Sequence, residues 1–343
     1  MAVRVVVTGS SGMLGSTLVE RLAGMGWDVL GVDVRPRPGG CPAAKYATAD
    51  VRDTSVMTRL VTGADAVVHC AAALPSYPPA EIHDVIAGGT RAVLRAAHRA
   101  GVPRVAHISS TAVYGLPESV PTPEDHPREP VDVYGHAKAA AEEVAEKFRA
   151  EGMCVPILRP KTFLGPGRMG LFAMLFEWAE EGRSFPILGR GDVRIQMLAV
   201  DDLVEAVVRV LQAPPEVAGD TYNIAAAEFA TLREDFQAVL DAAGHGRRVV
   251  SLPARPALAA LRLLGRTGLS PVYERLLYKL LADSYVDIGK ARDRLGFEPR
   301  LSNREAILRT YDWWRHHRVP AAAGRTSRDA WRQGALSLAK VFF

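Results

Sequence analysis

The hydrophobic residues of this chain form short apolar runs that are separated by longer amphipathic segments. The runs are rich in β-branched residues and are bounded by turn residues, which is typical of strands buried on both faces. They predict strands at 3–7, 28–33, 45–48, 65–70, 104–109 and 155–158. Helix-length segments lie between them, most clearly at 79–100 and 134–150. This alternation predicts an α/β protein with a doubly wound parallel sheet.

The pattern changes after residue 160. A glycine- and proline-rich loop, two helices, a returning strand and a mainly helical stretch are predicted at 165–170, 171–181, 201–211, 221–224 and 225–317. We expect a sheet domain made of 1–164 plus about 196–226, a smaller helical domain made of about 165–195 plus 227–320, and a tail at 321–343. Open α/β sheets bind ligands at the carboxyl ends of their strands, so the smaller domain should cover those ends and bind the substrate.

A glycine-rich turn follows the first strand. Gly9 allows a tight turn, Gly12 lets the backbone approach a pyrophosphate, and Gly15 lets the next helix lie close to its strand. The N-terminus of that helix would then face the phosphates. The pattern predicts a dinucleotide-binding turn, and the other residues expected to contact the dinucleotide there are Ser11, Met13 and Leu14.

Asp33 indicates which dinucleotide is bound. It ends the second predicted strand 18 residues after Gly15, where a carboxylate that binds the ribose hydroxyls is expected. Its charge would repel a 2′-phosphate, which favours NAD, whereas Arg35 and Arg37 just beyond it could pair with such a phosphate. We give Asp33 more weight because ordering arginines in a proline- and glycine-rich loop costs side-chain entropy.

Two further strand ends are expected to contact the dinucleotide. Asp50 follows the third predicted strand and could accept a hydrogen bond from the adenine amino group beside Val51. Ala71, Ala72 and Ala73 follow the fourth long apolar run and are small enough for a dinucleotide to lie against them. Tight packing of a helix is the alternative explanation for these alanines.

Composition narrows the class of protein. Of the 343 residues, 48% are hydrophobic and 23% are charged, which is ordinary for a globular domain with a large core. We find no signal sequence or transmembrane run, and the three widely spaced cysteines suggest neither disulfides nor a metal site, so we expect a cytoplasmic protein. A net charge of +4 is too small to indicate nucleic-acid binding.

Two C-terminal segments allow more than one interpretation. The leucine-rich stretch 257–282 is expected to be a helical pair packed under the core rather than a lipid-binding surface. The tail 321–343 interleaves basic and apolar residues, and could be an amphipathic helix that docks on a partner or a membrane. Packing of the tail on its own domain is the favoured alternative.

Tyr134 and Lys138 are the candidate chemical groups. They stand four residues apart at the start of a predicted helix and therefore lie on the same face, where the cation favours the phenolate form of the tyrosine. Ser109, Ser110 and Thr111 end the preceding predicted strand, where a hydroxyl can hydrogen-bond the substrate oxygen that Tyr134 deprotonates.

Taken in order, the motifs resemble the extended short-chain dehydrogenase/reductase family, in its NAD-dependent epimerase/dehydratase branch. The resemblance rests on TGSSGMLG, ADVRD, DAVVHCAAALP, GGTRAVLRAA, HISSTAVYG, YGHAK, ILRPKTFLGPG, LAVDDLVEAV, TYNIA and KARDRLGFEPR, and covers nearly the whole chain. It implies a Rossmann-like sheet domain, a smaller substrate domain, a bound NAD(H) or NADP(H) with Pro160 among its contacts, and often a homodimer; Asp33 favours NAD. It also implies catalytic roles for Ser110, Tyr134 and Lys138.

Two departures from the family's pattern concern the substrate. Thr162 replaces the asparagine that helps to hold the diphosphate in sugar-nucleotide enzymes, and Ile195 replaces an arginine, although Arg194 stands next to it. The expected substrate contacts are Ser110, Thr111, Tyr134, Thr162 and Arg194.

Three functions follow from the resemblance. The first is a sugar-nucleotide epimerase that works through a transient ketone; a dehydratase is disfavoured because Thr111 and Ala112 follow Ser110 where acid and base residues would stand. The second is a dehydrogenase or reductase of an apolar alcohol or ketone, similar to hydroxysteroid and dihydroflavonol enzymes. The third is a non-catalytic dinucleotide sensor.

Overall fold

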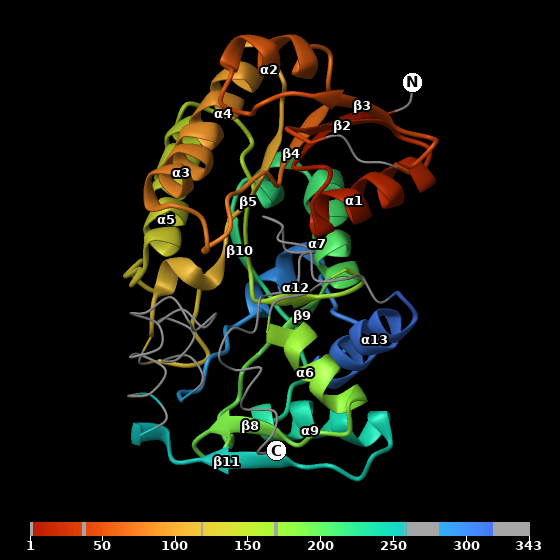
Figure 1. The fold of residues 1–343 in the computed structure, drawn as a ribbon. Helices are drawn as coiled ribbons and strands as arrows, with labels where there is room; N and C mark the ends of the chain where they lie inside the picture. Colours follow the sequence, from red (N-terminus) through yellow and green to blue (C-terminus); the bar gives the residue numbers. More distant parts are fainter. Residues whose placement is uncertain are drawn as a thin grey trace.

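One seven-stranded sheet, in which every neighbouring pair of strands is parallel, forms the centre of the computed structural model (Figure 1). The structure describes residues 3–35, 39–117, 119–167, 171–256, 258 and 281–317. The strands are β1 (Arg4–Thr8), β2 (Asp28–Asp33), β3 (Lys45–Thr48), β4 (Ala66–His69), β5 (Val105–Ile108), β6 (Ile157–Pro160) and β10 (Thr221–Ile224). Their order is β10-β6-β5-β4-β1-β2-β3, which confirms the predicted doubly wound sheet and places its switch point between β1 and β4.

Helices cover both faces of the sheet because successive strand residues point to opposite sides. Val5 and Val7 of β1 pack in one apolar layer, while Val6 packs in the other. The helices of the first layer are α1 (Met13–Gly24), α7 (Val200–Gln212) and α12 (Gly289–Leu295); those of the second are α2 (Thr54–Val61), α4 (Gly89–Arg99) and α5 (Val133–Ala150).

The helical segment predicted at 79–100 is divided into three parts. Helix α3 (Pro79–His83) continues through a π-helical turn (Asp84–Gly88) into α4. The remaining short elements next to the sheet are a 3₁₀ helix (Thr111–Tyr114) after β5 and α8 (Pro215–Ala218) before β10. The amphipathic pattern was continuous across the turn, and therefore gave no sign of the change in backbone hydrogen bonding.

A second layer lies beyond the carboxyl ends of the strands. Helices α6 (Leu171–Glu180), α9 (Leu232–Ala243) and α13 (Asn303–His316) surround an apolar cluster that contains Phe176, Trp178 and Phe236. Two small parallel sheets border it: β7 (Phe163–Leu164) with β9 (Leu198–Ala199), and β8 (Phe185–Leu188) with β11 (Val249–Leu252). Figure 1 shows these elements gathered below the large sheet.

Several predictions need correction. The strand predicted at 155–158 runs from 157 to 160, because Pro156 has no N–H to donate to the ladder. Three strands of the small sheets, β7, β8 and β9, lie in segments for which no element was predicted, and β11 lies in the stretch predicted to be mainly helical. The returning strand predicted at 221–224 is β10. The predictions for 321–343 and for almost all of 257–282 concern residues outside those that the structure describes. The domain boundaries stay a prediction.

The described ranges contain neither a membrane-spanning helix nor a cluster of metal ligands. No helix there is both long and apolar enough to cross a membrane. Over the same residues, no group of three or more His, Cys, Asp and Glu side chains is arranged to hold a metal ion.

Candidate functional site

The three glycines of the turn between β1 and α1 have different environments. Gly9 has a φ of +67°, and a Cβ there would lie 2.7 Å from the backbone nitrogen of Ala71. A Cβ at Gly15 would lie 2.2 Å from the Gly9 carbonyl oxygen. Both positions therefore need glycine for packing. A Cβ at Gly12 would meet only the Gly9 oxygen, at 3.2 Å, so Gly12 is the position that leaves room for a ligand.

The other residues predicted to contact the cofactor in this turn differ in what they can offer. The side chains of Met13 and Leu14 are buried in the core, so only their backbone amides can face a ligand. The Ser11 hydroxyl donates to the Arg35 carbonyl over 2.8 Å. The start of α1 has no side-chain cap, which leaves its first amides available to an anion.

Asp33 is held rigidly beside this turn. Its two carboxylate oxygens accept hydrogen bonds from the backbone N–H groups of Ser11, at 3.0 Å, and Arg35, at 3.1 Å. The carboxylate therefore joins the end of β2 to the glycine turn, as its proposed position next to a ribose requires. Arg37 lies outside the described residues.

Asp50 is partly engaged by another side chain. Its oxygens accept hydrogen bonds of 2.6–3.0 Å from the Arg52 guanidinium, which lowers the pKa of the carboxyl, and Arg52 also reaches Asp84 at 2.8 Å. Val51 is buried, and a Cβ at Gly89 would lie 3.0 Å from it. The predicted contact of Asp50 with adenine would have to use the lone pairs that Arg52 leaves.

The three alanines after β4 do not share one environment. Ala71 is half-buried beside the glycine turn, and Ala72 is exposed. Ala73 is 2% exposed and packs with Ile82 and Ile86. The alternative explanation, tight helix packing, thus describes Ala73, whereas Ala71 lies beside the glycine turn and Ala72 is open to solvent.

Tyr134 and Lys138 lie on one face of α5, as their spacing predicts. The Lys138 Nζ is 5.9 Å from the centre of the Tyr134 ring and donates a 2.7 Å hydrogen bond to the Ile108 carbonyl at the end of β5. Burial lowers the pKa of Lys138 to about 8, so the amine is still mostly protonated at pH 7. Asp132 caps the helix by accepting from the Gly135 N–H at 2.6 Å, which fixes where α5 begins.

Of the three hydroxyl groups that follow β5, only that of Ser110 is partly exposed and able to donate its proton to a ligand. Ser109 is 3% exposed and donates a 2.5 Å hydrogen bond to Glu142, and Thr111 is 7% exposed. Ser110 is half-buried, and its Oγ accepts from the Ala112 N–H at 3.1 Å, which leaves its own proton free to be donated.

The turn that begins at Ser110 packs directly against the start of α5. A Cβ at Gly135 would lie 2.8 Å from the Ala112 carbonyl oxygen, so glycine at this position allows the close approach. The structure thereby brings the Ser110 turn to the helix end that carries Tyr134.

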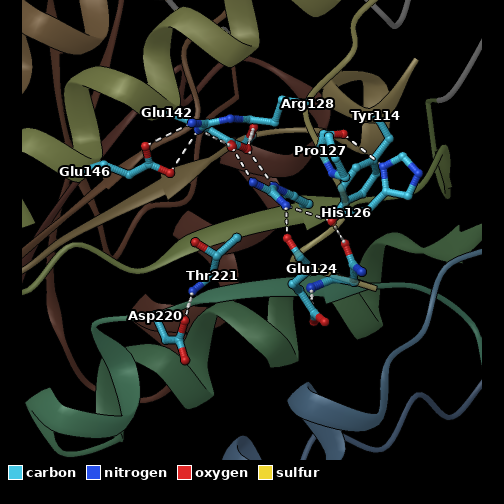
Figure 2. Close-up of polar contacts among 12 residues, drawn as sticks. Tyr114, Glu124, His126, Pro127, Arg128, Glu142, Glu146, Asp220 and Thr221 are labelled. Atoms are coloured by element: carbon cyan, nitrogen blue, oxygen red, sulfur yellow. Dashed lines mark hydrogen bonds and ion pairs between the residues drawn. The ribbon is translucent and has the colours of Figure 1, made fainter. Parts of the chain in front are cut away.

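A buried polar cluster behind this face was not predicted (Figure 2). Arg159 of β6 donates to Glu142 at 2.9 and 2.7 Å, and to the Tyr114 hydroxyl at 2.7 Å. Tyr114 donates in turn to Asn223, whose backbone N–H donates to Glu124 over 2.8 Å. An arginine within a buried strand is a signal that could have led to this cluster.

The predicted contacts after β6 have different exposures. Pro160 ends the strand and is buried, and its carbonyl lies 3.5 Å from the Thr111 hydroxyl. Thr162 is exposed, so its hydroxyl is available to a ligand.

Arg194 does not occupy the position of the arginine that Ile195 replaces. Its guanidinium donates to the Tyr285 hydroxyl at 2.8 Å and lies 4.8 Å from that ring and 5.8 Å from the Phe229 ring. Ile195 packs instead against the apolar cluster of the second layer. Neighbouring residues of this extended segment therefore point to opposite sides.

Comparison with known proteins gives consistent matches. The sequence profile described as the NAD dependent epimerase/dehydratase family matches residues 5–225. An uncharacterized protein of Sinorhizobium fredii, y4nG, is 35% identical, over 94% of this chain and 81% of that protein. A UDP-glucose 4-epimerase of Mycolicibacterium smegmatis is 29% identical, over 91% and 99%. A 3 beta-hydroxysteroid dehydrogenase/Delta 5-->4-isomerase of Mycobacterium tuberculosis is 30% identical, over 89% and 88%.

A solved structure with the same fold is the dTDP-glucose 4,6-dehydratase DesIV of Streptomyces venezuelae, with NAD and TYD bound. It superposes with a TM-score of 0.74 at 26% identity, and the match covers 92% of this chain and 98% of that one. The resemblance inferred from the motifs thus extends to the fold, over 92% of this chain.

Proposed function

Because this chain belongs to the NAD-dependent epimerase/dehydratase family, we propose that it is an NAD-dependent enzyme that acts on a secondary alcohol, with Tyr134 as the base. The observation that carries the proposal is the position of Lys138, whose Nζ faces the Tyr134 ring while it is tied to the strand that leads to Ser110. A cation about 6 Å away favours a phenolate by up to about 3 kcal/mol at an effective dielectric near 20, before solvent screening is deducted.

The residues present fit the cofactor. Gly12 leaves space at the start of α1, and Asp33 is fixed where it would accept hydrogen bonds from ribose hydroxyls. When bound, NAD would supply a hydride acceptor at the substrate carbon and, in an epimerase, return the hydride. Ser110 would donate a hydrogen bond to the substrate oxygen while Tyr134 removes its proton.

For the substrate, we propose first a nucleotide sugar, with epimerisation as the reaction. The UDP-glucose 4-epimerase and the dTDP-glucose 4,6-dehydratase among the similar proteins support this class. Thr111 and Ala112 are buried and carry no acidic group, so the chain lacks the acid and base pair that dehydration would need directly after Ser110.

A dehydrogenase of an apolar alcohol is the second candidate, and one observation favours it. The position where an arginine would contact the diphosphate is Ile195, and its side chain joins an apolar cluster. The similar 3 beta-hydroxysteroid dehydrogenase/Delta 5-->4-isomerase belongs to such a class. We also propose that the protein is a homodimer, which light scattering after size-exclusion chromatography tests directly.

The experiment combines a substrate panel with one variant. UDP-glucose, dTDP-glucose and a 3β-hydroxysteroid are each incubated with the protein and NAD. Because epimers have the same mass, nucleotide-sugar products are separated by chromatography against authentic epimers, and oxidised products are identified by mass spectrometry. We expect epimerised nucleotide sugar from wild type and none from Tyr134→Phe, with NAD affinity changed by no more than a few fold. Steroid oxidation alone would select the second candidate. Activity of Tyr134→Phe above about a hundredth of wild type would remove Tyr134 from its role, and no turnover of any compound beside tight NAD binding would favour a dinucleotide sensor.

A further inference from the structure

Glu142 lies one helical turn beyond Lys138 and is the centre of the buried cluster in Figure 2. Its side chain is 0% exposed. One oxygen accepts from Ser109 at 2.5 Å and from Arg159 at 2.9 Å, and the other accepts from Arg159 at 2.7 Å and from Arg128 at 3.2 Å. A carboxylate with this many donors is held in one position.

Lys138 and Glu142 together hold two consecutive residues at the end of β5: Ile108, its last residue, and Ser109, which follows it. The Lys138 amine donates to the carbonyl of Ile108, and the Glu142 carboxylate accepts from the hydroxyl of Ser109. The next residue along the chain is Ser110. Two side chains one turn apart on α5 therefore fasten the end of β5 at two adjacent points, directly before the hydroxyl that we assign to the substrate.

We propose that Glu142 is a positioning residue: together with Lys138 it fastens the Ser110 strand end to α5, and its negative charge keeps Lys138 protonated. The inference rests on the proposed roles of Ser110, Tyr134 and Lys138, but its test does not require the substrate.

Several ionisable groups lie near Lys138, and they differ in whether they are charged at pH 7. His69 and His107 lie on adjacent strands with their rings stacked 5.8 Å apart, and burial lowers the pKa of His69 to about 3 and that of His107 well below its usual range. Burial raises the pKa of the Cys70 thiol to about 12. Cys70 and Glu142 both oppose the effect of burial on the pKa of Lys138, Cys70 the more strongly, but Cys70 does so only as a thiolate. At pH 7 the thiol and both imidazoles are uncharged, so Glu142 is the group that opposes burial there.

The arginines around Glu142 determine how loss of its negative charge would change the pKa of Lys138. In the native protein, Arg128 and Arg159 face the two carboxylates Glu142 and Glu146. With glutamine at position 142, two guanidinium groups would face one carboxylate, and the field at Lys138 would become more positive. The Lys138 ammonium would then lose its proton at lower pH.

Competitive acetylation measures this effect on the whole protein. Trace acetic anhydride is applied between pH 6 and 10.5, and peptide mass spectrometry follows acetylation at Lys138 and at the exposed Lys147 of the same helix. In Glu142→Gln the midpoint for Lys138 should fall by about one to two pH units, the order expected for loss of one charge roughly 6–10 Å away at an effective dielectric near 20. The midpoint for Lys147 should stay the same.

Glu146→Gln is the matched control. Glu146 lies on the same helix and binds the same Arg128, at 2.9 Å, but its side chain is 39% exposed and is one turn farther from Lys138. This variant should move the Lys138 midpoint by less than about a third of the Glu142→Gln shift, because solvent screens an exposed charge. Equal midpoints in wild type, Glu142→Gln and Glu146→Gln would overturn the proposal.

Two further measurements keep the proposal testable if Glu142→Gln folds poorly. Arg159→Gln removes a cation and should raise the Lys138 midpoint. A lowered or unchanged midpoint would contradict the proposal that the charges around Glu142 affect the protonation of Lys138. Ser109→Ala should leave the midpoint unchanged but increase hydrogen exchange in residues 109–115 severalfold, and unaltered exchange would overturn the fastening role. If Tyr134→Phe remained active while these shifts appeared, the proposed function would fail and the positioning of Lys138 would stand.

Discussion

Replacement of Asp33 by alanine should change which nicotinamide cofactor the protein prefers. The carboxylate is fixed by the backbone N–H groups of Ser11 and Arg35, at 3.0 and 3.1 Å. Two effects follow from its loss. The ribose hydroxyls lose an acceptor, which weakens NAD binding, and a 2′-phosphate loses a fixed negative neighbour, which strengthens NADP binding.

The size of the second effect comes from the charges involved. Two like charges about 4 Å apart at an effective dielectric near 20 repel by about 4 kcal/mol, which corresponds to several hundredfold or more in affinity. Arg35 is exposed and would compensate only in part after losing side-chain entropy. We therefore expect wild type to bind NAD at least about a hundredfold more tightly than NADP, and Asp33→Ala to reduce that ratio at least about tenfold.

The assay is a fluorescence titration of NADH and NADPH at fixed ionic strength. Asp28→Ala is the matched control, because Asp28 begins the same strand but pairs with Lys45 at 3.0 Å, away from the glycine turn. The ratio of the two dissociation constants is the informative quantity, since loss of the Ser11 contact loosens the turn for both cofactors. Tighter NADPH than NADH binding by wild type, or an unchanged ratio in Asp33→Ala, would refute the reasoning.

Three further predictions concern the hydroxyl, the glycine turn and a buried acid. Ser110→Ala should lower turnover about 10²- to 10⁴-fold in the substrate assay, and a loss below tenfold would assign the role to another hydroxyl. Gly12→Ala should weaken NAD binding with little change in melting temperature. In Gly15→Ala the new Cβ would lie 2.2 Å from the Gly9 oxygen, so this variant should lose about 1–3 kcal/mol of stability. Equal melting temperatures of the two variants would contradict the different roles of these glycines. Burial raises the pKa of Asp235 to about 6, so the native state binds its proton more tightly than the unfolded chain, and stability relative to Asp235→Asn should fall as pH rises from about 4 to 6. A difference between the two proteins that does not vary with pH would remove Asp235 from this role.

Sequence reasoning located the elements whose signals are local. The predicted bounds of β2, β3 and β10 agree with the structure. The small sheets were missed because β8 pairs with β11, a strand about sixty residues later, and because β7 and β9 are only two residues long and have no periodicity of their own. Their pairing depends on the apolar cluster beneath them, which a linear pattern does not show.

The same limit applies to the candidate site. The spacing of Tyr134 and Lys138 alone placed them on one face of a helix. Glu142 and Glu143 are adjacent acids in that helix, and only the structure shows that Arg159, from another strand, holds Glu142 in the interior while Glu143 stays exposed. The four-residue step from Lys138 to Glu142 was an available signal, because it places both side chains on the same face.

The choice between the two substrate classes depends on two adjacent residues, Arg194 and Ile195. Arg194 is next in sequence to the position where an arginine would hold a diphosphate, but in an extended segment the adjacent side chain points the opposite way. Arg194 contacts Tyr285, while Ile195 packs in the apolar cluster. Arg194 therefore cannot replace the missing arginine without a change in backbone register.

A nucleotide sugar would need its cationic contacts from other elements, whereas an apolar alcohol would need none. Ile195→Arg should therefore improve the affinity for a UDP-sugar only if this chain already binds one. An improvement at least tenfold, with no gain for a 3β-hydroxysteroid, would support the nucleotide-sugar assignment, and no improvement would favour the apolar substrate.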